Sequence, residues 1–362
     1  MKTFLKSEWP LLAGLATTAL FLAFAGWLAD LASPAWFGFV SSWLFAAILV
    51  ASFAAVRHAE AIAARLGEPL GTLVLTLAVT GIEVTIIAAV MYAGQGNSAL
   101  ARDAMFAVVM IVLNGMIGLS LLLGGLRFRE QTYNLQGANA FLAVIVPIAV
   151  LGLVLPNFTS SPGPSYSPLH ASFFIVMSIV LYGVFLAIQN VRHREYFIDS
   201  AAAGAAPGHG EARSLAWHAP LLALYLVAVV LLAKQLALPI NYGIHVMQAP
   251  AALGGFLVSV LVLAPESLSA ARAALANQLQ RSVNLLLGSV LASISLTIPA
   301  VLAIGFITDQ TIVLGLDAAD TTLLVLTLAV STLTFASSRT NVLLGVVHLL
   351  LFLAYLMLIF EK

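Results

Sequence analysis

Residues Leu75–Gly94 read LTLAVTGIEVTIIAAVMYAG, an apolar run with one ionisable residue, Glu83, near its centre. An α-helix needs about 20 apolar residues to cross the hydrocarbon core of a bilayer, and this run is long enough. A carboxylate in the middle of such a helix is costly to insert and usually marks an ion or proton path. This stretch therefore predicts a transmembrane helix with a functional residue at Glu83.

The composition of the whole chain predicts a helical membrane protein. Of 362 residues, 62% are hydrophobic and 8% are charged, whereas a soluble domain has about 25% charged residues. The apolar runs are long rather than short and alternating, which favours helices over a transmembrane barrel. The net charge of zero gives no indication of a nucleic-acid partner. The absence of cysteine excludes disulfides and thiolate metal sites.

The apolar segments predict eleven membrane-spanning helices. Their approximate ranges are 11–29, 35–56, 70–93, 103–126, 139–156, 170–190, 217–236, 246–271, 282–305, 320–338 and 341–360. The first segment is longer than the core of a signal peptide, so we interpret it as a span and not as a cleaved leader.

The Lys and Arg residues predict the orientation, because inner loops are enriched in positive charge. If the N-terminus is cytoplasmic and the C-terminus is outside, all 15 basic residues except Arg102, Lys234 and Lys362 fall on the inner side. The uncharged loop PNFTSSPGPSYSPLH then lies outside. The compact loops favour a bacterial inner membrane.

A second acidic residue within a predicted span, Glu266, lies in GGFLVSVLVLAPESLSAARAAL, residues 254–275. Aligning the two glutamates pairs LTLAVTGIEV with VSVLVLAPES, and in the next spans it pairs Asn114 with Ser293. Each half of the chain then has five spans. Because five is odd, the second half would enter the membrane from the opposite side, as in transporters built from inverted repeats.

The predicted fold is therefore an all-α polytopic membrane protein with one extra N-terminal helix and two inverted five-helix repeats. The tail and first helix take residues 1–33, the first repeat 34–190, a cytoplasmic linker rich in Ala and Gly 191–216, and the second repeat 217–362. Inverted-repeat transporters bind their substrates near the bilayer midplane at the repeat interface, where we expect both glutamates.

Oxygen-bearing side chains accompany both glutamates. Thr80 precedes Glu83 by three residues and lies on the same helix face. Gly254–Gly255 and Pro265 are expected to break the helix of Glu266 and free carbonyl oxygens. Hard cations such as Ca²⁺ take 6–8 oxygen ligands. The candidate ligands are Glu83, Glu266, Asn114, Ser293, Ser289 and Thr80.

The alternative interpretation of the serines and threonines is structural, because such residues commonly join membrane helices by hydrogen bonds. His348 is isolated on an apolar helix, where a hydrogen-bonded packing role is favoured over a proton relay. Thr327, Ser331, Thr334 and Ser338 share one face of the tenth span and are expected to pack against other helices. No His or Cys set has the spacing of a Zn or Cu site, and no resident cofactor is expected.

Several stretches resemble the calcium/proton antiporters of the cation/Ca²⁺ exchanger superfamily, in particular its bacterial ChaA-type members. The most specific is LLLGGLRFREQTYNLQGANAFLAVIVPIAVLGLVLPN, residues 121–157, which is similar to the family's EQ-x-(F/Y)N segment and the helix after it. LAPESLSAARAALANQLQRSVNLLLGSVLASISLTIPAVL, residues 263–302, resembles the family's second ion-binding repeat. The resemblance covers residues 67–360.

This resemblance implies a secondary transporter that exports Ca²⁺ in exchange for H⁺ by alternating access. Glu83 and Glu266 would be the paired acidic ligands, with Asn114, Ser289 and Ser293 on the flanking helices. The chain departs from the family at four places where many members have Gly-Asn, Gly-Ser or Gln. These places hold Val79-Thr80, Val262-Leu263, Val109-Met110 and Ala292.

Other functions remain open from the sequence. The lost amide oxygens leave exchange of Na⁺ or K⁺ for H⁺ on the same fold as an alternative. A cation channel, which would conduct without proton coupling, and a non-transporting membrane scaffold are alternatives of another class. An intramembrane enzyme is not expected, because the chain has no Cys nucleophile and no HExxH motif. The expected partners are Ca²⁺ and protons, or Na⁺ or K⁺ in place of Ca²⁺, together with the lipid bilayer.

Overall fold

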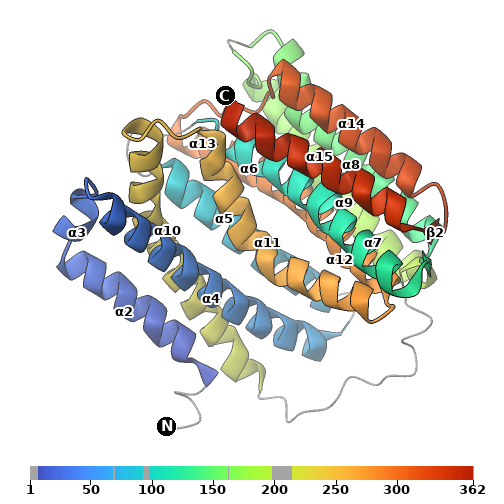
Figure 1. The fold of residues 1–362 in the computed structure, drawn as a ribbon, viewed down its shortest axis with the longest axis horizontal. Coiled ribbons are helices and arrows are strands. Elements are labelled where there is room, and N and C mark those ends of the chain that lie inside the picture. The colour runs from blue at the N-terminus through green and yellow to red at the C-terminus, as the bar shows by residue number, and fades with distance from the viewer. Residues whose placement is uncertain (1–6, 68–69, 93–97, 162, 198–213, 362) are drawn as a thin grey trace. The chain divides into compact units, whose positions relative to one another are not determined.

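The computed structural model describes residues 7–67, 70–92, 98–161, 163–197 and 214–361, and nearly all of its elements are helices (Figure 1). The α-helices are α2 (Trp9–Ala23), α3 (Gly26–Ala29), α4 (Pro34–Leu66), α5 (Leu70–Met91), α6 (Leu100–Val109), α7 (Ile117–Phe128), α8 (Leu135–Leu153), α9 (Pro168–Ala187), α10 (Leu215–His245), α11 (Ala252–Leu275), α12 (Leu279–Ala292), α13 (Ile298–Thr308), α14 (Ala318–Thr334) and α15 (Val342–Glu361).

Short segments of other kinds interrupt or join these helices. Two π-helical segments, η1 (Met110–Met116) and η5 (Ser293–Thr297), lie within long helices, and a third, η3 (Ile188–Arg192), ends one. Two 3-10 turns are η2 (Leu155–Phe158) and η4 (Arg194–Tyr196). Strands β1 (Gln131–Thr132) and β2 (Arg339–Thr340) pair antiparallel, with Gln131 opposite Thr340.

The eleven predicted spans each coincide with a helix or a continuous run of helical segments. Within the described ranges, nine helical runs are long and apolar enough to cross a membrane. The first and tenth predicted spans, α2 and α14, are shorter apolar helices of 15 and 17 residues. The fold is thus the all-α polytopic membrane architecture that the sequence predicts.

One prediction about local structure is wrong. Gly254–Gly255 and Pro265 do not break the helix of Glu266, because α11 is one uninterrupted α-helix with Pro265 inside it. Proline removes a single N–H group, so only the carbonyl of Leu261, one turn earlier, loses its helical donor. The departures from α-helix fall in the neighbouring spans instead, at η1 and η5.

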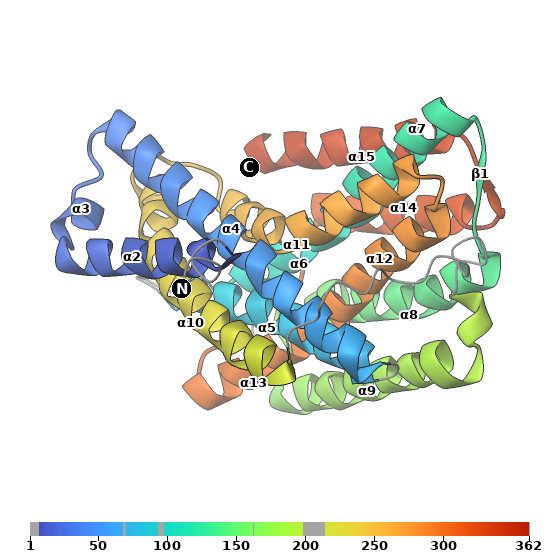
Figure 2. The same ribbon diagram turned by 90° about the horizontal axis from the view of Figure 1, so that it is seen from below.

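The chain forms two compact units, and each takes helices from both predicted repeats. Unit 1 comprises Met1–Leu100 and His209–Pro265, and unit 2 comprises Ala101–Gly208 and Glu266–Lys362. In unit 1, α2 packs on α4 and α10, and α5 packs on the same two helices (Figures 1 and 2). Most of the predicted linker 191–216 lies outside the described residues.

A buried carboxylate fixes the N-terminal helix within unit 1. Glu8 accepts hydrogen bonds from Arg57 at 2.9 Å and from the hydroxyl of Tyr225 at 2.9 Å, and its Oε2 lies 3.1 Å from Nε2 of His58. Burial alone would raise the pKa of Glu8, but the bonds from His58 and Tyr225 and the charge of Arg57 lower it below its usual range. These partners satisfy the charge, so Glu8 has a structural role that joins α2 to α4 and α10.

Candidate functional site

Glu83 lies on α5 in unit 1, in the predicted apolar surroundings. Its side chain is 1% exposed, and its neighbours Ile82, Ile86 and Ile87 are buried. Thr80, one turn earlier, is also buried and shares its helix face. α5 packs on α4 and α10, so the carboxylate faces protein in a region of low dielectric constant. There a carboxylate binds a cation or a proton far more readily than it stays charged alone.

Glu266 lies on α11 in unit 2 and is partly buried. It follows Pro265, which leaves the carbonyl of Leu261 without its usual helical donor. A carboxylate and an adjacent backbone carbonyl are both oxygen ligands suited to a hard cation. α11 thus offers some of the chemistry expected of a broken helix without a break in its backbone.

Asn114 lies in the π-helical segment η1, which interrupts the run from α6 to α7 in unit 2. Its side chain is fully buried, at 0% exposed. π-helical turns are rare in proteins and are found frequently at functional sites. Asn114 therefore combines a buried amide side chain with a rare backbone conformation. The sequence alone does not indicate this conformation.

Hydrogen bonds hold the amide of Asn114 at both of its ends. Nδ2 donates to Oγ1 of Thr327 on α14 at 2.8 Å and contacts Sδ of Met110 at 3.4 Å. Oδ1 lies 3.2 Å from Nδ1 of His348 on α15. Nε2 of His348 in turn lies 2.9 Å from Oγ1 of Thr334. His348 is hydrogen-bonded, as predicted, and one of its partners, Asn114, is a candidate ligand.

Ser289 and Ser293 lie one turn apart in unit 2, Ser289 on α12 and Ser293 at the first position of the π-helical segment η5. Both side chains are buried. Two residues further, the carbonyl of Ser295 accepts a hydrogen bond from the hydroxyl of Ser178 on α9 at 3.1 Å. The hydroxyl of Ser295 is buried and has no hydrogen-bond partner within the described ranges. η5 thus gathers hydroxyl groups, whereas η1 presents an amide.

The two π-helical segments pack in a reciprocal way within unit 2. η1, from the predicted first repeat, packs against α14 and α15 of the second. η5, from the predicted second repeat, packs against α8 and α9 of the first. Figures 1 and 2 show α14 beside α15 and α8 beside α9. Each segment thus packs against helices of the other predicted repeat. The two segments contain Asn114 and Ser293, the residues that the alignment of the two halves pairs.

The candidate residues fall into groups by element. Thr80 and Glu83 lie together on α5 of unit 1. The remaining candidates belong to unit 2, where α12 with Ser289 packs against η1 with Asn114. The sequence predicts packing roles for Thr327 and Thr334 and does not connect them with Asn114. Ser338, predicted to share their helix face, instead lies beyond the end of α14 and is exposed. The only available signal was the stripe of hydroxyl residues along one face of the tenth span.

The segment on which the family resemblance rests lies next to this network. Gln131 donates from Nε2 to the carbonyl of Ala274 and to Oδ1 of Asn277, both at 3.0 Å. The hydroxyl of Tyr133 lies 3.3 Å from the carbonyl of Thr334. The EQ-x-YN segment therefore ties the ends of α11 and α14 together within unit 2 and holds no candidate ligand itself.

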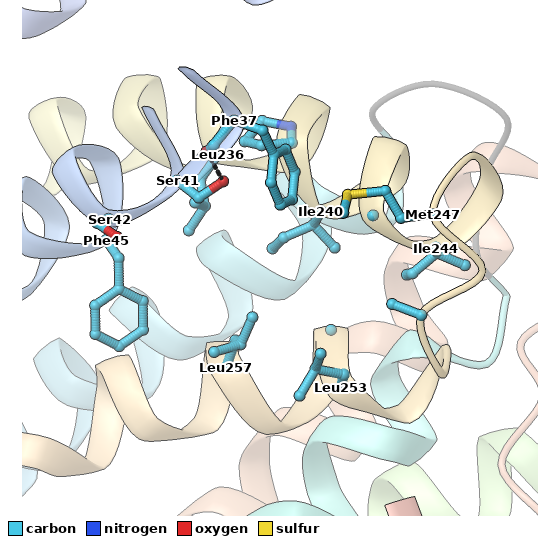
Figure 3. Close-up of a pocket in the computed structure, with 14 residues that line it drawn as sticks. Phe37, Ser41, Ser42, Phe45, Leu236, Ile240, Ile244, Met247, Leu253 and Leu257 are labelled. Atoms are coloured by element: carbon cyan, nitrogen blue, oxygen red, sulfur yellow. Dashed lines mark hydrogen bonds between the residues drawn. The ribbon is translucent and has the colours of Figure 1, made fainter. Parts of the chain in front are cut away.

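A cavity of about 520 Å³ in unit 1 has a different chemistry from the candidate site (Figure 3). Residues of α4, α10 and α11 line it, and most are apolar, among them Phe45, Leu236 and Leu257. The hydroxyl of Ser41 donates to the carbonyl of Phe37 within the same helix at 2.7 Å. The cavity thus lacks carboxylates and suits an apolar occupant, not a cation.

No group of three or more His, Cys, Asp or Glu side chains is placed to hold a metal ion in the ranges that the structure describes. The candidate ligands described above are a mixed set of carboxylate, amide and hydroxyl oxygens. Such a set suits transient binding of hard cations.

Comparisons with known proteins give a consistent result. The family model described as sodium/calcium exchanger protein matches residues 34–191 and 217–361. The chain is 47% identical over 311 residues to the y4hA protein of Sinorhizobium fredii, covering 85% of each chain. It is 42% identical over 318 residues to the sodium-potassium/proton antiporter ChaA of Escherichia coli, covering 86% of each. The fold is similar to that of native YfkE, with a TM-score of 0.75 at 16% identity over 98% of this chain and 100% of that one.

Proposed function

The chain belongs to the sodium/calcium exchanger family of membrane transporters, and from this premise we propose that it is a proton-coupled cation antiporter in which Glu83 and Glu266 bind the cation and protons alternately. The observation that supports this most directly is the burial of Glu83, 1% exposed, on an apolar transmembrane helix. A carboxylate in that position is costly unless it exchanges one positive partner for another.

Charge neutrality provides the coupling between the two substrates. In a region of low dielectric constant, two carboxylates of one site cannot both stay ionised without a positive partner. Either a divalent cation or two protons neutralise the pair. Binding of one substrate therefore displaces the other. Alternating access then requires one group of helices to move against another, as in other inverted-repeat transporters.

Ca²⁺ is the cation that the paired carboxylates favour, because two negative charges match its charge and oxygen is its preferred ligand. Asn114, Ser289, Ser293 and Thr80 would supply neutral oxygens. In this proposal protons entering the cytoplasm drive Ca²⁺ out across a bacterial plasma membrane.

Na⁺ or K⁺ is the second candidate, and two observations favour it. The ChaA protein of Escherichia coli, 42% identical, is named a sodium-potassium/proton antiporter. This chain also has Thr80 and Leu263 where many antiporters have an amide before each glutamate. A monovalent cation would neutralise one carboxylate while the other keeps a proton.

The test uses purified protein in liposomes with an imposed pH gradient and an internal pH-sensitive dye. Ca²⁺, Na⁺ and K⁺ are added separately to wild type, to Glu83→Gln and to Glu8→Gln. We expect Ca²⁺ to collapse the gradient at the lowest concentration, in wild type and Glu8→Gln but not in Glu83→Gln. Collapse by Na⁺ or K⁺ alone would establish the second candidate. Cation flux without proton movement would indicate a channel, and retained exchange in Glu83→Gln would refute the role of that carboxylate.

A further inference from the structure

The amide of Asn114 is held by side chains from three elements of unit 2, and all of these side chains are buried. Thr327 and His348 bond its two ends, and Met110 lies beside its nitrogen. The hydroxyl of Thr327 also contacts Sδ of Met110 at 3.6 Å. An asparagine that only joined two helices would need one such bond. Here both the donor and the acceptor end of the amide are fixed.

The hydrogen-bond pattern determines which ring nitrogen of His348 carries a proton. With the amide oxygen of Asn114 on the side of His348, Nδ1 of His348 donates to it across the 3.2 Å separation. In the neutral ring Nε2 then accepts from the hydroxyl of Thr334 at 2.9 Å. The hydroxyl of Tyr133, which donates to the carbonyl of Ser337, also lies 3.3 Å from the carbonyl of Thr334. Both ring nitrogens of His348 therefore lie within hydrogen-bond distance of buried polar groups.

The sulfur of Met110 lies beside Nδ2 and can only accept, which agrees with this orientation of the amide of Asn114. If the amide were rotated by half a turn, its NH₂ group would meet the N–H of His348, and two donors would face each other. The oxygen is therefore kept on the side of His348 and the nitrogen on the side of Thr327. An amide oxygen has two lone pairs, so one remains for a cation after His348 takes the other.

A close approach of two helices keeps His348 in place. A Cβ atom on Gly118 of α7 would lie 3.0 Å from Cβ of His348 and 3.0 Å from the carbonyl oxygen of Gly345. Small residues at such contacts let membrane helices approach each other closely. Gly118 and Gly345 therefore bring α15 close enough for His348 to reach Asn114.

We propose that His348 is a positioning residue, which orients the carbonyl oxygen of Asn114 for the transported cation through its Nδ1–H group. The inference deepens the proposed function and rests on it, because it assumes that Asn114 is a cation ligand of the antiporter. His348 itself does not bind the cation or relay protons in this proposal. Its effect on transport passes entirely through Asn114.

Three substitutions separate this role from simple packing. His348→Asn keeps an N–H donor near the position of Nδ1, His348→Gln places one near the position of Nε2, and His348→Leu removes both. We expect His348→Leu and His348→Gln to raise the cation concentration for half-maximal exchange about five- to tenfold, the effect of one lost hydrogen bond. His348→Asn should restore most of the affinity. The maximal exchange rate should change little in any of the three.

A double-mutant cycle with Asn114→Ala completes the test in the same liposome assay. If His348 acts through Asn114, His348→Leu adds nothing to the loss already caused by Asn114→Ala. Additive effects, or rescue by Gln instead of Asn, would overturn the inference while the proposed function stands. An unchanged cation dependence in Asn114→Ala would also overturn it. Absence of exchange in the wild type would refute the proposed function, and the inference with it.

Discussion

The two π-helical segments of unit 2 share a backbone feature but differ in their side chains. η1 presents the amide of Asn114, fixed at both ends by Thr327 and His348. η5 carries the hydroxyl groups of Ser293 and Ser295, and the carbonyl of Ser295 accepts a hydrogen bond from the hydroxyl of Ser178 on α9. The common feature accords with two repeats of one ancestral helix pair. The difference is one of chemistry, because the candidate ligand of the first repeat is an amide and that of the second is a hydroxyl group.

The largest expected effect concerns the carboxylates on the helices before these segments. Glu83→Gln and Glu266→Gln should each reduce cation-driven proton movement to the rate of empty liposomes, because a neutral amide cannot exchange a cation for a proton. Glu8→Gln is the matched control, since Glu8 is buried in the same unit as Glu83 but is neutralised by Arg57 and His58. If only one of these two variants, Glu83→Gln or Glu266→Gln, kept some exchange, the carboxylates of the two repeats would contribute unequally to transport.

The next effect concerns how closely the helices beside the two π-helical segments are packed. Gly345 lies on α15, which packs against η1, and Gly288 lies on α12, which continues directly into η5. A Cβ atom on Gly345 would lie 2.6 Å from the backbone nitrogen of Leu122, which cannot move aside, so Gly345→Ala should destabilise the protein by about 1–3 kcal/mol. A Cβ atom on Gly288, near η5, would meet only Phe141 at 3.7 Å, so Gly288→Ala should be tolerated. Thermal unfolding in detergent, followed by far-ultraviolet circular dichroism, measures both. Equal stabilities would contradict the tighter packing on the η1 side.

The sequence predicts the helices well, because their lengths follow from the cost of placing polar groups in a bilayer, and it places Glu83 at a position that is buried in the structure. An apolar run such as Leu75–Gly94 predicts a transmembrane helix, and a carboxylate within it, such as Glu83, indicates a functional residue. The partners of Asn114 could not be predicted, since Thr327 and His348 are more than two hundred residues away along the chain. The π-helical segments have no sequence signal of their own. Pro265 misled the prediction, because one missing N–H group does not end a well-packed helix.

A smaller effect is expected for the candidate ligands of the two π-helical segments, Asn114 of η1 and Ser293 of η5. Asn114→Ala should raise the cation concentration for half-maximal exchange about tenfold, because the variant loses a preoriented oxygen next to a charge. Ser293→Ala should raise it about threefold, since other hydroxyl groups of η5 can substitute for a single lost one. Thr332→Ala on α14 is a control, because its hydroxyl donates to the carbonyl of Leu328 within its own helix at 2.8 Å. Equal losses at Asn114 and Ser293 would remove the proposed difference between the repeats.

The smallest effect is expected where α9 touches η5. Ser178→Ala removes the hydrogen bond to the carbonyl of Ser295. A neutral bond of this kind contributes about 0.5–1.5 kcal/mol to stability, so a slightly lower melting temperature should be the main result. The cation dependence of exchange should stay within twofold of wild type, since no candidate ligand side chain is held by Ser178. A loss of affinity as large as that of His348→Leu would mean that the carbonyl of Ser295 is itself positioned for the cation. In that case the second repeat would orient a backbone oxygen where the first orients an amide.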